Sequence, residues 1–299
     1  QALWRARETR SSSELARFIA RMRVHAIDDQ DPTGPWIRRE FPSLFYVFNH
    51  SPDGDKWNSC YRGMFTGGDL SLTSRAWIEE HVRTGHGALG AAYPTETYTG
   101  PNPHKCLKEG DTPSWAYFLR NGLNVPERPE YGGWGGRFRA LDAERNRHYG
   151  DAVDTVDGET GGPVTTWRWR PVFQNHFAAR MDRCLRSPGE TNPGPRAVVQ
   201  EDETSGPVEI VAAPGSTIEL SAEGTVHPLG LPVACSWWIY REAGDPATSA
   251  EATLTPATAR TCTLSVPSRA SEDAEVHVIL EVTDSGEPPL TAYRRVIVR

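Results

Sequence analysis

The sequence predicts an α/β domain followed by an all-β sandwich, because three features occur in that order along the chain. Helix-like and strand-like runs alternate in the first 50 residues, a Pro- and Gly-rich stretch follows near residue 190, and short strand-like runs at regular spacing fill the remainder. A chain of 299 residues is long enough for two cores. We therefore expect domains at residues 1–188 and 207–299, joined by a linker at 189–206.

The chain is expected to open with two helices, at residues 1–10 and 12–23. The second helix carries an apolar stripe at helical spacing, and Ser12 or Ser13 can cap its start. The opening stretch QALWRARETR has no initiator Met and no signal peptide, and it begins within a helical pattern. The sequence therefore predicts an N-terminally truncated fragment or processed form.

Two short apolar runs, at residues 24–27 and 44–48, predict buried parallel strands separated by a helix-like connector. Ligands of such sheets bind beyond the carboxyl ends of the strands. Asp28, Asp29 and Asn49 all follow these ends directly. They are therefore candidate binding residues, although loop acids and a turn-forming Asn are ordinary alternatives.

The central stretch, residues 50–165, is rich in Gly, Pro, Trp and Tyr, which predicts long loops over a site or, alternatively, poorly ordered loops. Residues 165–185 predict the closing helix of the first domain, with Pro171 in its first turn. Its inward face is expected to carry Val172, Phe173, Phe177, Met181 and Leu185.

The strand-like runs after the linker predict a β-sandwich. Alternation in ACSWWIY places Trp237 in the core and Trp238 on the outside. Cys235 and Cys262 share the parity of their apolar neighbours, so both should face one core. A disulfide and two buried free thiols are equally compatible with that placement.

The charge pattern argues against nucleic acid as a partner. Residues 191–299 contain seven basic and fifteen acidic side chains, and the net charge of the chain is −7. Neither half offers a basic stripe for a phosphate backbone, and no apolar run has the length of a membrane span. The acidic sandwich and the presence of only three lysines among 32 basic residues suit a secreted or periplasmic protein of a high-GC organism.

Four stretches together resemble one family: EGDTPSWAYFL, LRNGLNVPERPEYGGWGGRF, TTWRWRPVFQNHFAARMD and VILEVTDSGEPPLTAYRRVIV. The chain is similar to bacterial and fungal proteins that join a nucleoside-hydrolase-like domain to a C-terminal immunoglobulin-like domain and are often described as cellulose-binding. The resemblance covers nearly the whole chain. It implies the C-terminal portion of a nucleoside-hydrolase-like domain at 1–188 and an immunoglobulin-like sandwich at 207–299.

The resemblance also implies a calcium site. In nucleoside hydrolases an N-terminal aspartate cluster and one downstream aspartate before a helix hold Ca²⁺, which orients the ribose hydroxyls and the attacking water. Asp111, which precedes a predicted helix, matches the downstream ligand in type and placement. No DxDxxxDD-type cluster occurs in residues 1–299, so the other ligands are expected upstream. Asp is also a preferred N-cap, and cap and ligand remain equally weighted interpretations of Asp111.

Other candidate substrate-binding residues come from the same resemblance. Asn49 in VFN resembles the last residue of the Glu-Phe-Asn element that binds ribose hydroxyls, but Val47 replaces the glutamate. Asp28 and Asp29 lie where the sheet of this family faces its pocket. Trp134, in GGWGG, could stack on a sugar or base, whereas packing of its loop is the ordinary alternative. No catalytic residue is assigned.

Two functions follow as hypotheses. The first is hydrolysis of a glycosyl bond, plausibly N-ribosidic and calcium-dependent, by the parent protein, with the truncated chain itself inactive. The second is binding of cellulose or another polysaccharide, without catalysis, through exposed aromatic residues such as Trp238, Tyr240 or Trp134. The expected ligand is therefore nucleoside-like or a carbohydrate.

Overall fold

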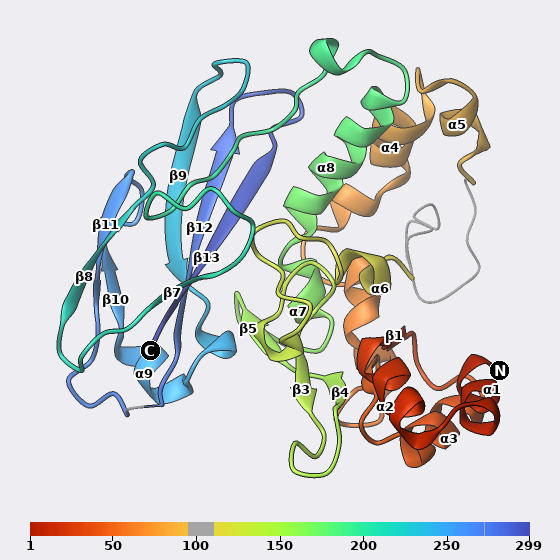
Figure 1. The fold of residues 1–299 in the computed structure, drawn as a ribbon. Coiled ribbons are helices and arrows are strands. Elements are labelled where there is room, and N and C mark those ends of the chain that lie inside the picture. Colours follow the sequence, from red (N-terminus) through yellow and green to blue (C-terminus); the bar gives the residue numbers. More distant parts are fainter. Residues whose placement is uncertain (95–110, 272) are drawn as a thin grey trace.

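The computed structural model describes residues 1–94, 111–271 and 273–299, and Figure 1 shows them as a mixed helix-and-sheet part beside two packed sheets. The first part contains a four-stranded sheet in the order β1-β2-β4-β3. The two parallel strands predicted from the sequence are confirmed, since β1 pairs with β2 in parallel. β4 also runs parallel to β2, whereas β3 is antiparallel to β4. The strands are β1 Arg23–Ala26, β2 Phe45–Phe48, β3 Phe138–Ala140 and β4 His148–Asp151.

Helices cover one face of this sheet because the strands alternate between two apolar surfaces. Leu44, Tyr46 and Phe48 pack with Leu3 and Ile19 of the helices, whereas alternate residues of β2 face a second cluster on the other side. The cap of α2 differs from the prediction: Ser11, rather than Ser12 or Ser13, forms a capping box with Glu14. These helices are α1 Ala2–Thr9, α2 Ser12–Arg21 and α3 Thr33–Glu40.

The central region consists of short helical turns that end in one long helix. The predicted closing helix is confirmed as α8 Arg170–Arg183, with Pro171 in its first turn. Leu185 was expected to face inward, but the helix ends before it and its side chain is 49% exposed. The preceding elements are η1 Lys56–Asn58, η2 Cys60–Met64, η3 Leu70–Thr73, α4 Arg75–Ile78, η4 Glu79–Arg83, α5 Gly87–Ala92, α6 Thr112–Ala116, η5 Pro129–Tyr131, β5 Asp154–Val156, β6 Glu159–Gly161 and α7 Val164–Trp167.

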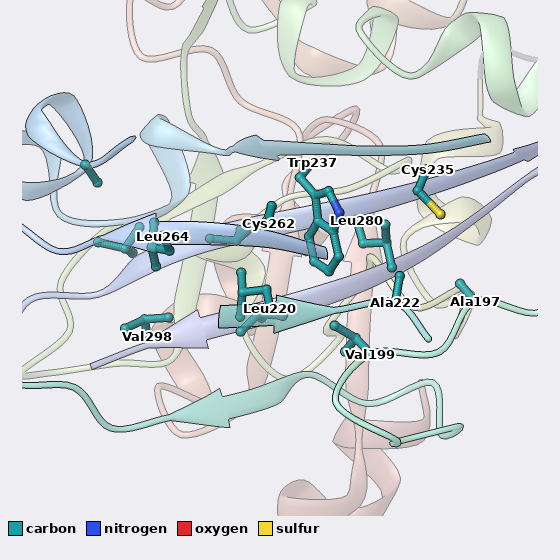
Figure 2. Packing of buried hydrophobic residues seen from close by; sticks show 14 of the residues in the cluster. Ala197, Val199, Leu220, Ala222, Cys235, Trp237, Cys262, Leu264, Leu280 and Val298 are labelled. Atoms are coloured by element: carbon teal, nitrogen blue, oxygen red, sulfur yellow. The ribbon is translucent and has the colours of Figure 1, made fainter. Parts of the chain in front are cut away.

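The C-terminal part packs a four-stranded sheet against a three-stranded sheet. Trp237 is buried between them, as predicted, and Figure 2 shows it pointing from its strand toward Leu220. Cys235 and Cys262 are buried in the same core as free thiols. The sheets have the orders β7-β13-β12-β9 and β10-β11-β8. Their strands are β7 Val208–Ile210, β8 Thr217–Ser221, β9 Val233–Ile239, β10 Thr253–Thr255, β11 Thr261–Ser265, β12 Val276–Asp284 and β13 Thr291–Val298, accompanied by η6 Pro188–Glu190, η7 Arg241–Ala243 and α9 Pro246–Glu251.

Residues 189–206, the predicted linker, lie against the sandwich. Ala197 and Val199 are buried in its core, and the Asn192 amide donates to the Asp284 carboxylate at 3.0 and 3.1 Å. The chain between the two parts is therefore held by apolar and polar contacts. The domain boundaries themselves stay a prediction.

An apolar cluster joins the two parts of the molecule, and we call it the interface cluster. It corrects two expectations. Tyr240 is fully buried, and Trp238, expected to face outward, packs 5.7 Å from Trp169 and 5.5 Å from Tyr240 between ring centroids. The outer face of β9 is thus covered by the first domain. The buried residues that define the cluster across the boundary are Leu123, Trp134, Trp169, Phe173, Tyr240, Ile279 and Tyr293.

Buried charged side chains at this boundary have hydrogen-bond partners. Arg295 is fully buried, donates to the carbonyls of Leu123 and Gly132, and also donates to His277 Nδ1, each at 2.9 Å. A buried Asp154 accepts hydrogen bonds from Arg137, Arg168 and the Tyr240 hydroxyl, at 2.6, 2.8 and 2.7 Å. Such pairing is what buried charge requires. Within the residues described, no helix is both long and apolar enough to cross a membrane.

Candidate functional site

The carboxyl ends of β1, β2 and β4 bring His25, Asn49 and Asp151 together. Asn49 is 1% exposed, and its amide nitrogen donates to Asp151 Oδ1 at 3.2 Å and to Cys60 Sγ at 2.7 Å. Its amide oxygen lies 3.2 Å from His25 Nε2. The side chain predicted to bind substrate is therefore fully engaged inside the protein.

Asp151 anchors this network from the end of β4. Its carboxylate accepts hydrogen bonds from Ser59 Oγ at 2.6 Å and from the Cys60 backbone N–H at 2.9 Å, in addition to Asn49. Burial raises the pKa of Asp151, and these hydrogen bonds oppose the rise. Because its oxygens are occupied and the residue is fully buried, Asp151 ties η2 to the sheet.

The remaining members of the network are not poised for chemistry. Burial lowers the pKa of His25 to about 4, so the imidazole is neutral near pH 7, and its ring stands edge-on to Tyr117 and Phe138 at 5.2 and 5.3 Å. Burial raises the pKa of the Cys60 thiol well above its usual value, which disfavours the nucleophilic thiolate. We interpret the network as a polar core that fixes the edge of the sheet.

Tyr61, the residue after Cys60, experiences the charges of both Asp28 and Asp111. Burial raises the pKa of Tyr61, Arg62 lowers it, and the charges of Asp28, Asp151 and Asp111 each raise it. α6 packs against η2, which accounts for the proximity of Asp111 to Tyr61. Two predicted site residues that are distant in sequence thus act electrostatically on the same side chain.

Asp28 has a left-handed backbone, with φ of +59°, and its carboxylate accepts a hydrogen bond from the Asp29 N–H at 2.8 Å. This conformation is uncommon for a residue other than glycine and is enriched at functional sites. Asp29 points elsewhere: it forms a two-bond ion pair with Arg38, at 2.8 and 2.5 Å. Asp29 therefore acts in folding, since it connects α3 to the sheet edge.

Asp111 occupies the N-cap position of α6, but its side chain makes no capping hydrogen bond and is exposed. Its carbonyl accepts from Ser114 N–H and Oγ instead. The described part of the chain contains no group of three or more His, Cys, Asp or Glu residues arranged to hold a metal ion. Ca²⁺ takes about six to eight oxygen ligands, so Asp28 and Asp111 do not by themselves fit a calcium site.

A separate cavity of about 310 Å³ lies between α6 and α8. Trp134 is 4% exposed and packs in the interface cluster, yet it also contributes to the cavity wall. Trp115, on α6, is 53% exposed. The described lining consists of Met64, Thr112, Trp115, Ala116, Trp134, Phe173, Gln174, His176, Phe177 and Arg180.

Comparison with family models gives two matches in the order predicted. The model described as "Cellulose-binding Sde182, nucleoside hydrolase-like domain" matches residues 1–138, and "Cellulose-binding protein Sde0182, C-terminal domain" matches residues 217–299. A solved structure, a nucleoside hydrolase-related hypothetical protein from Saccharophagus degradans associated with carbohydrate metabolism, is 30% identical with a TM-score of 0.79. The alignment covers 100% of this chain and 67% of that chain. The chain belongs to the cellulose-binding Sde182 family.

Other comparisons add no argument about this Sde182-family chain. The PapD-like domain 7 of human CEP192 is 17% identical, with 38% of this chain and 92% of that chain covered, but its TM-score is 0.25. No curated protein gave a significant match.

The structure brings Asp28, Asn49 and Asp111 to one region of this Sde182-family chain, with Asn49 beneath the surface, and leaves Asp29 and Trp134 in other contacts. Sequence reasoning missed Asp151, because the strand it ends is short and its partner Asn49 is 102 positions away. It also missed Trp115 and Arg180. For Trp115 the only signal was the aromatic residue at the start of SWAYFL, a run that we expected to be helix.

Proposed function

We propose that the chain binds cellulose or a related polysaccharide, and that sugar rings stack on Trp115 at the cavity between α6 and α8. The observation that carries the proposal is the half-exposed Trp115 beside a cavity walled by Trp134, Phe173 and Phe177. Membership of a family described as cellulose-binding supports it.

The physical argument rests on the two kinds of surface that a sugar presents. The C–H face of a pyranose packs on an indole, and its hydroxyls require hydrogen-bond partners at the edge of the contact. Thr112, Gln174 and His176 contribute to the lining; Gln174 Nε2 already donates to the Leu72 carbonyl and His176 Nε2 lies 3.0 Å from the Thr291 carbonyl, so a sugar hydroxyl would need other atoms of the lining. An aromatic wall with a small number of polar groups is the usual composition of a small-molecule site.

The test is retention of Trp115→Ala on microcrystalline cellulose. Truncation should weaken binding by roughly tenfold, equivalent to about 1.4 kcal/mol, and should leave the unfolding free energy nearly unchanged. Trp57→Ala is the matched control, because Trp57 is similarly exposed, at 44%, and does not belong to the described lining. Equal losses in both variants, or none in Trp115→Ala, would contradict the proposal.

A second candidate function is hydrolysis of a glycosyl bond, of the N-glycosyl type cleaved by calcium-dependent nucleoside hydrolases. The approach of Asp28 and Asp111 to Tyr61, with the left-handed backbone of Asp28, favours it. Any Ca²⁺ bound there would need oxygen ligands beyond these two carboxylates.

Calorimetric titration with CaCl₂ tests the metal part of this second function. Asp111→Ala should weaken binding at least tenfold if Asp111 is a ligand, whereas Asp142→Ala, on a distant exposed loop, should not. Equal calcium affinity in wild type and Asp111→Ala would remove Asp111 from the site. Release of free base from a nucleoside by the wild-type protein would then report on catalysis separately.

We also propose a fold type for the C-terminal sandwich, a cellular location for the protein, and the absence of nucleic acid among its partners. The two-sheet packing around Trp237 supports an immunoglobulin-like class for the sandwich. A secreted or periplasmic location agrees with the low lysine content and with a polysaccharide ligand. The same acidic character opposes binding to nucleic acid.

A further inference from the structure

One cation at the cavity, Arg180, forms an ion pair with none of the acidic residues that the structure describes. The Arg180 guanidinium of α8 lies over the Trp115 ring, 5.3 Å from its centroid, and Arg180 contributes to the cavity lining. Among the described residues, Arg180 forms no ion pair, whereas Arg38, Arg137 and Arg168 each pair with an aspartate. The cation and the exposed indole therefore form one surface at the opening between α6 and α8.

The surroundings of Arg180 are electropositive. Burial lowers the pKa of Arg180, and repulsion from Arg183, in the same final turns of α8, lowers it further. The C-terminal end of a helix favours cations, which accounts for basic residues at this end. It does not account for a guanidinium placed over an indole beside a cavity. The described lining contains no Asp or Glu, so none of these residues would repel an anion through a carboxylate.

We propose that this cavity takes a sugar residue that carries a carboxylate, as in a uronic-acid polysaccharide, with the carboxylate paired to Arg180 and the ring stacked on Trp115. A planar guanidinium matches a carboxylate with two parallel hydrogen bonds, and this geometry distinguishes an acid from a hydroxymethyl group. The inference rests on the proposed polysaccharide binding and names the sugar class.

The size of the cavity fits this occupant. Its volume of about 310 Å³ lies near the lower end of the range for small-molecule sites, about 300 to 1,000 Å³. A single sugar residue or a short oligosaccharide fits that volume, whereas a bulky ligand does not. Aromatic residues from both α6 and α8 line the cavity, so an inserted ring would contact two walls.

The experiment compares two probes that differ only at C6. Cellotriose and its C6-oxidised form, a trimer of β-1,4-linked glucuronic acid, are titrated into the protein at low salt, with tryptophan fluorescence or calorimetry as the readout. We expect the acid to bind roughly tenfold more tightly and to lose that advantage as salt rises, because screening weakens an exposed ion pair. Arg180→Gln should bring the ratio of the two affinities close to one, whatever its effect on cellotriose itself, whereas Arg180→Lys should keep part of the preference for the acid.

Arg17→Gln, an exposed arginine on α2, is the control and should behave as wild type. Equal affinity of wild type for the two probes, or the same preference for the acid in wild type and Arg180→Gln, overturns this inference. In either case a loss of cellulose retention in Trp115→Ala leaves the proposed polysaccharide binding standing. Failure of that variant to lose retention, with no binding of either probe, overturns both.

Discussion

Arginine and aromatic side chains occur both at the boundary between the two parts of the molecule and at the cavity between α6 and α8. At the boundary they are buried against each other, whereas Arg180 and Trp115 at the cavity remain accessible. At the boundary, arginines are buried and each finds an acceptor, as Arg295 does with two carbonyls and His277. At the cavity, Arg180 lies over an exposed indole and pairs with no described carboxylate. A cation that is buried on folding needs hydrogen-bond acceptors or a counter-ion inside the protein. A cation at a cavity without a counter-ion remains available to a ligand. Substitutions at the boundary should therefore reduce stability, whereas substitutions at the cavity should reduce ligand binding.

The largest effect is expected from Arg295→Met, which keeps much of the volume and removes the donors. The carbonyls of Leu123 and Gly132 and the His277 ring would lose their hydrogen-bond donor inside the protein. We expect the unfolding free energy to fall by about 3 to 5 kcal/mol. Urea denaturation measures it, with Arg180→Met, at the cavity, as control. A loss below about 1 kcal/mol in Arg295→Met would show that the boundary tolerates unpaired groups.

The second prediction is that acid lowers the free energy of unfolding through His277 at the boundary. The pKa of His277 is lowered to about 4, chiefly by burial; the hydrogen bond with Glu275 opposes this shift, and the charge of Arg295, which donates to the ring, adds to it. Between pH 6.5 and 4 the unfolded chain therefore binds more protons, so stability falls as pH falls through this window, by up to about 3 kcal/mol. The pKa of Glu275 is lowered to about 2, so its contribution is lost only below pH 4.5.

Denaturation at several pH values checks this prediction. His277→Gln keeps a neutral acceptor for Arg295 and should reduce the slope between pH 6.5 and 4. Part of the slope should persist, because His25 also has a pKa of about 4. An unchanged slope in the variant would mean that His277 does not titrate in this window.

Trp238, at the boundary, and Trp115, at the cavity, should respond to truncation in opposite ways. Trp238→Ala is expected to cost about 2 to 4 kcal/mol of stability, because its ring packs on Trp169 and Tyr240 at the boundary. Cellulose retention of the remaining folded protein should match wild type. Trp115→Ala should instead lower cellulose retention and leave stability nearly unchanged. If Trp238→Ala instead lowers retention without affecting stability, the sugar-binding face lies on the sandwich.

The smallest effect concerns Asp111. It sits at the N-cap of α6 without a capping bond, so Asp111→Ala should change stability by less than about 0.5 kcal/mol. Asp245, the N-cap of α9, accepts from the Thr248 N–H at 2.8 Å, and Asp245→Ala should lower the melting temperature more than Asp111→Ala does. Thermal unfolding compares the pair. A larger loss for Asp111→Ala would restore the capping role and weaken the case for a ligand.

Much of the fold could be predicted from local pattern. The apolar period of residues 165–185, with Pro171 near the start, predicted α8 but made it too long at both ends, since α7 is a separate helix and α8 ends at Arg183. The run LFYVF predicted β2, because a buried strand needs apolar residues on both faces. By contrast, β4 has the sequence HYGD, which carries no strand pattern; its pairing with β2 supplies the hydrogen bonds.

The candidate site was predicted only in part. Asp28 and Asp111 were identified by residue type, and their approach to Tyr61 depends on the packing of α6 against η2. Neither Asp151 nor Arg180 has a neighbour in sequence that marks it. Their surroundings come from segments far along the chain.

Local pattern was sufficient for the parity of strands such as β2 and β9 and for most of α8, because these features depend on neighbours within a few residues. It placed Trp237 in a core and Trp238 on the opposite face of β9. What covers each face became visible only in the folded molecule. The face of Trp238 meets another domain, whereas the α6 surface with Trp115 stays open, because burial depends on contacts between segments that no local period encodes.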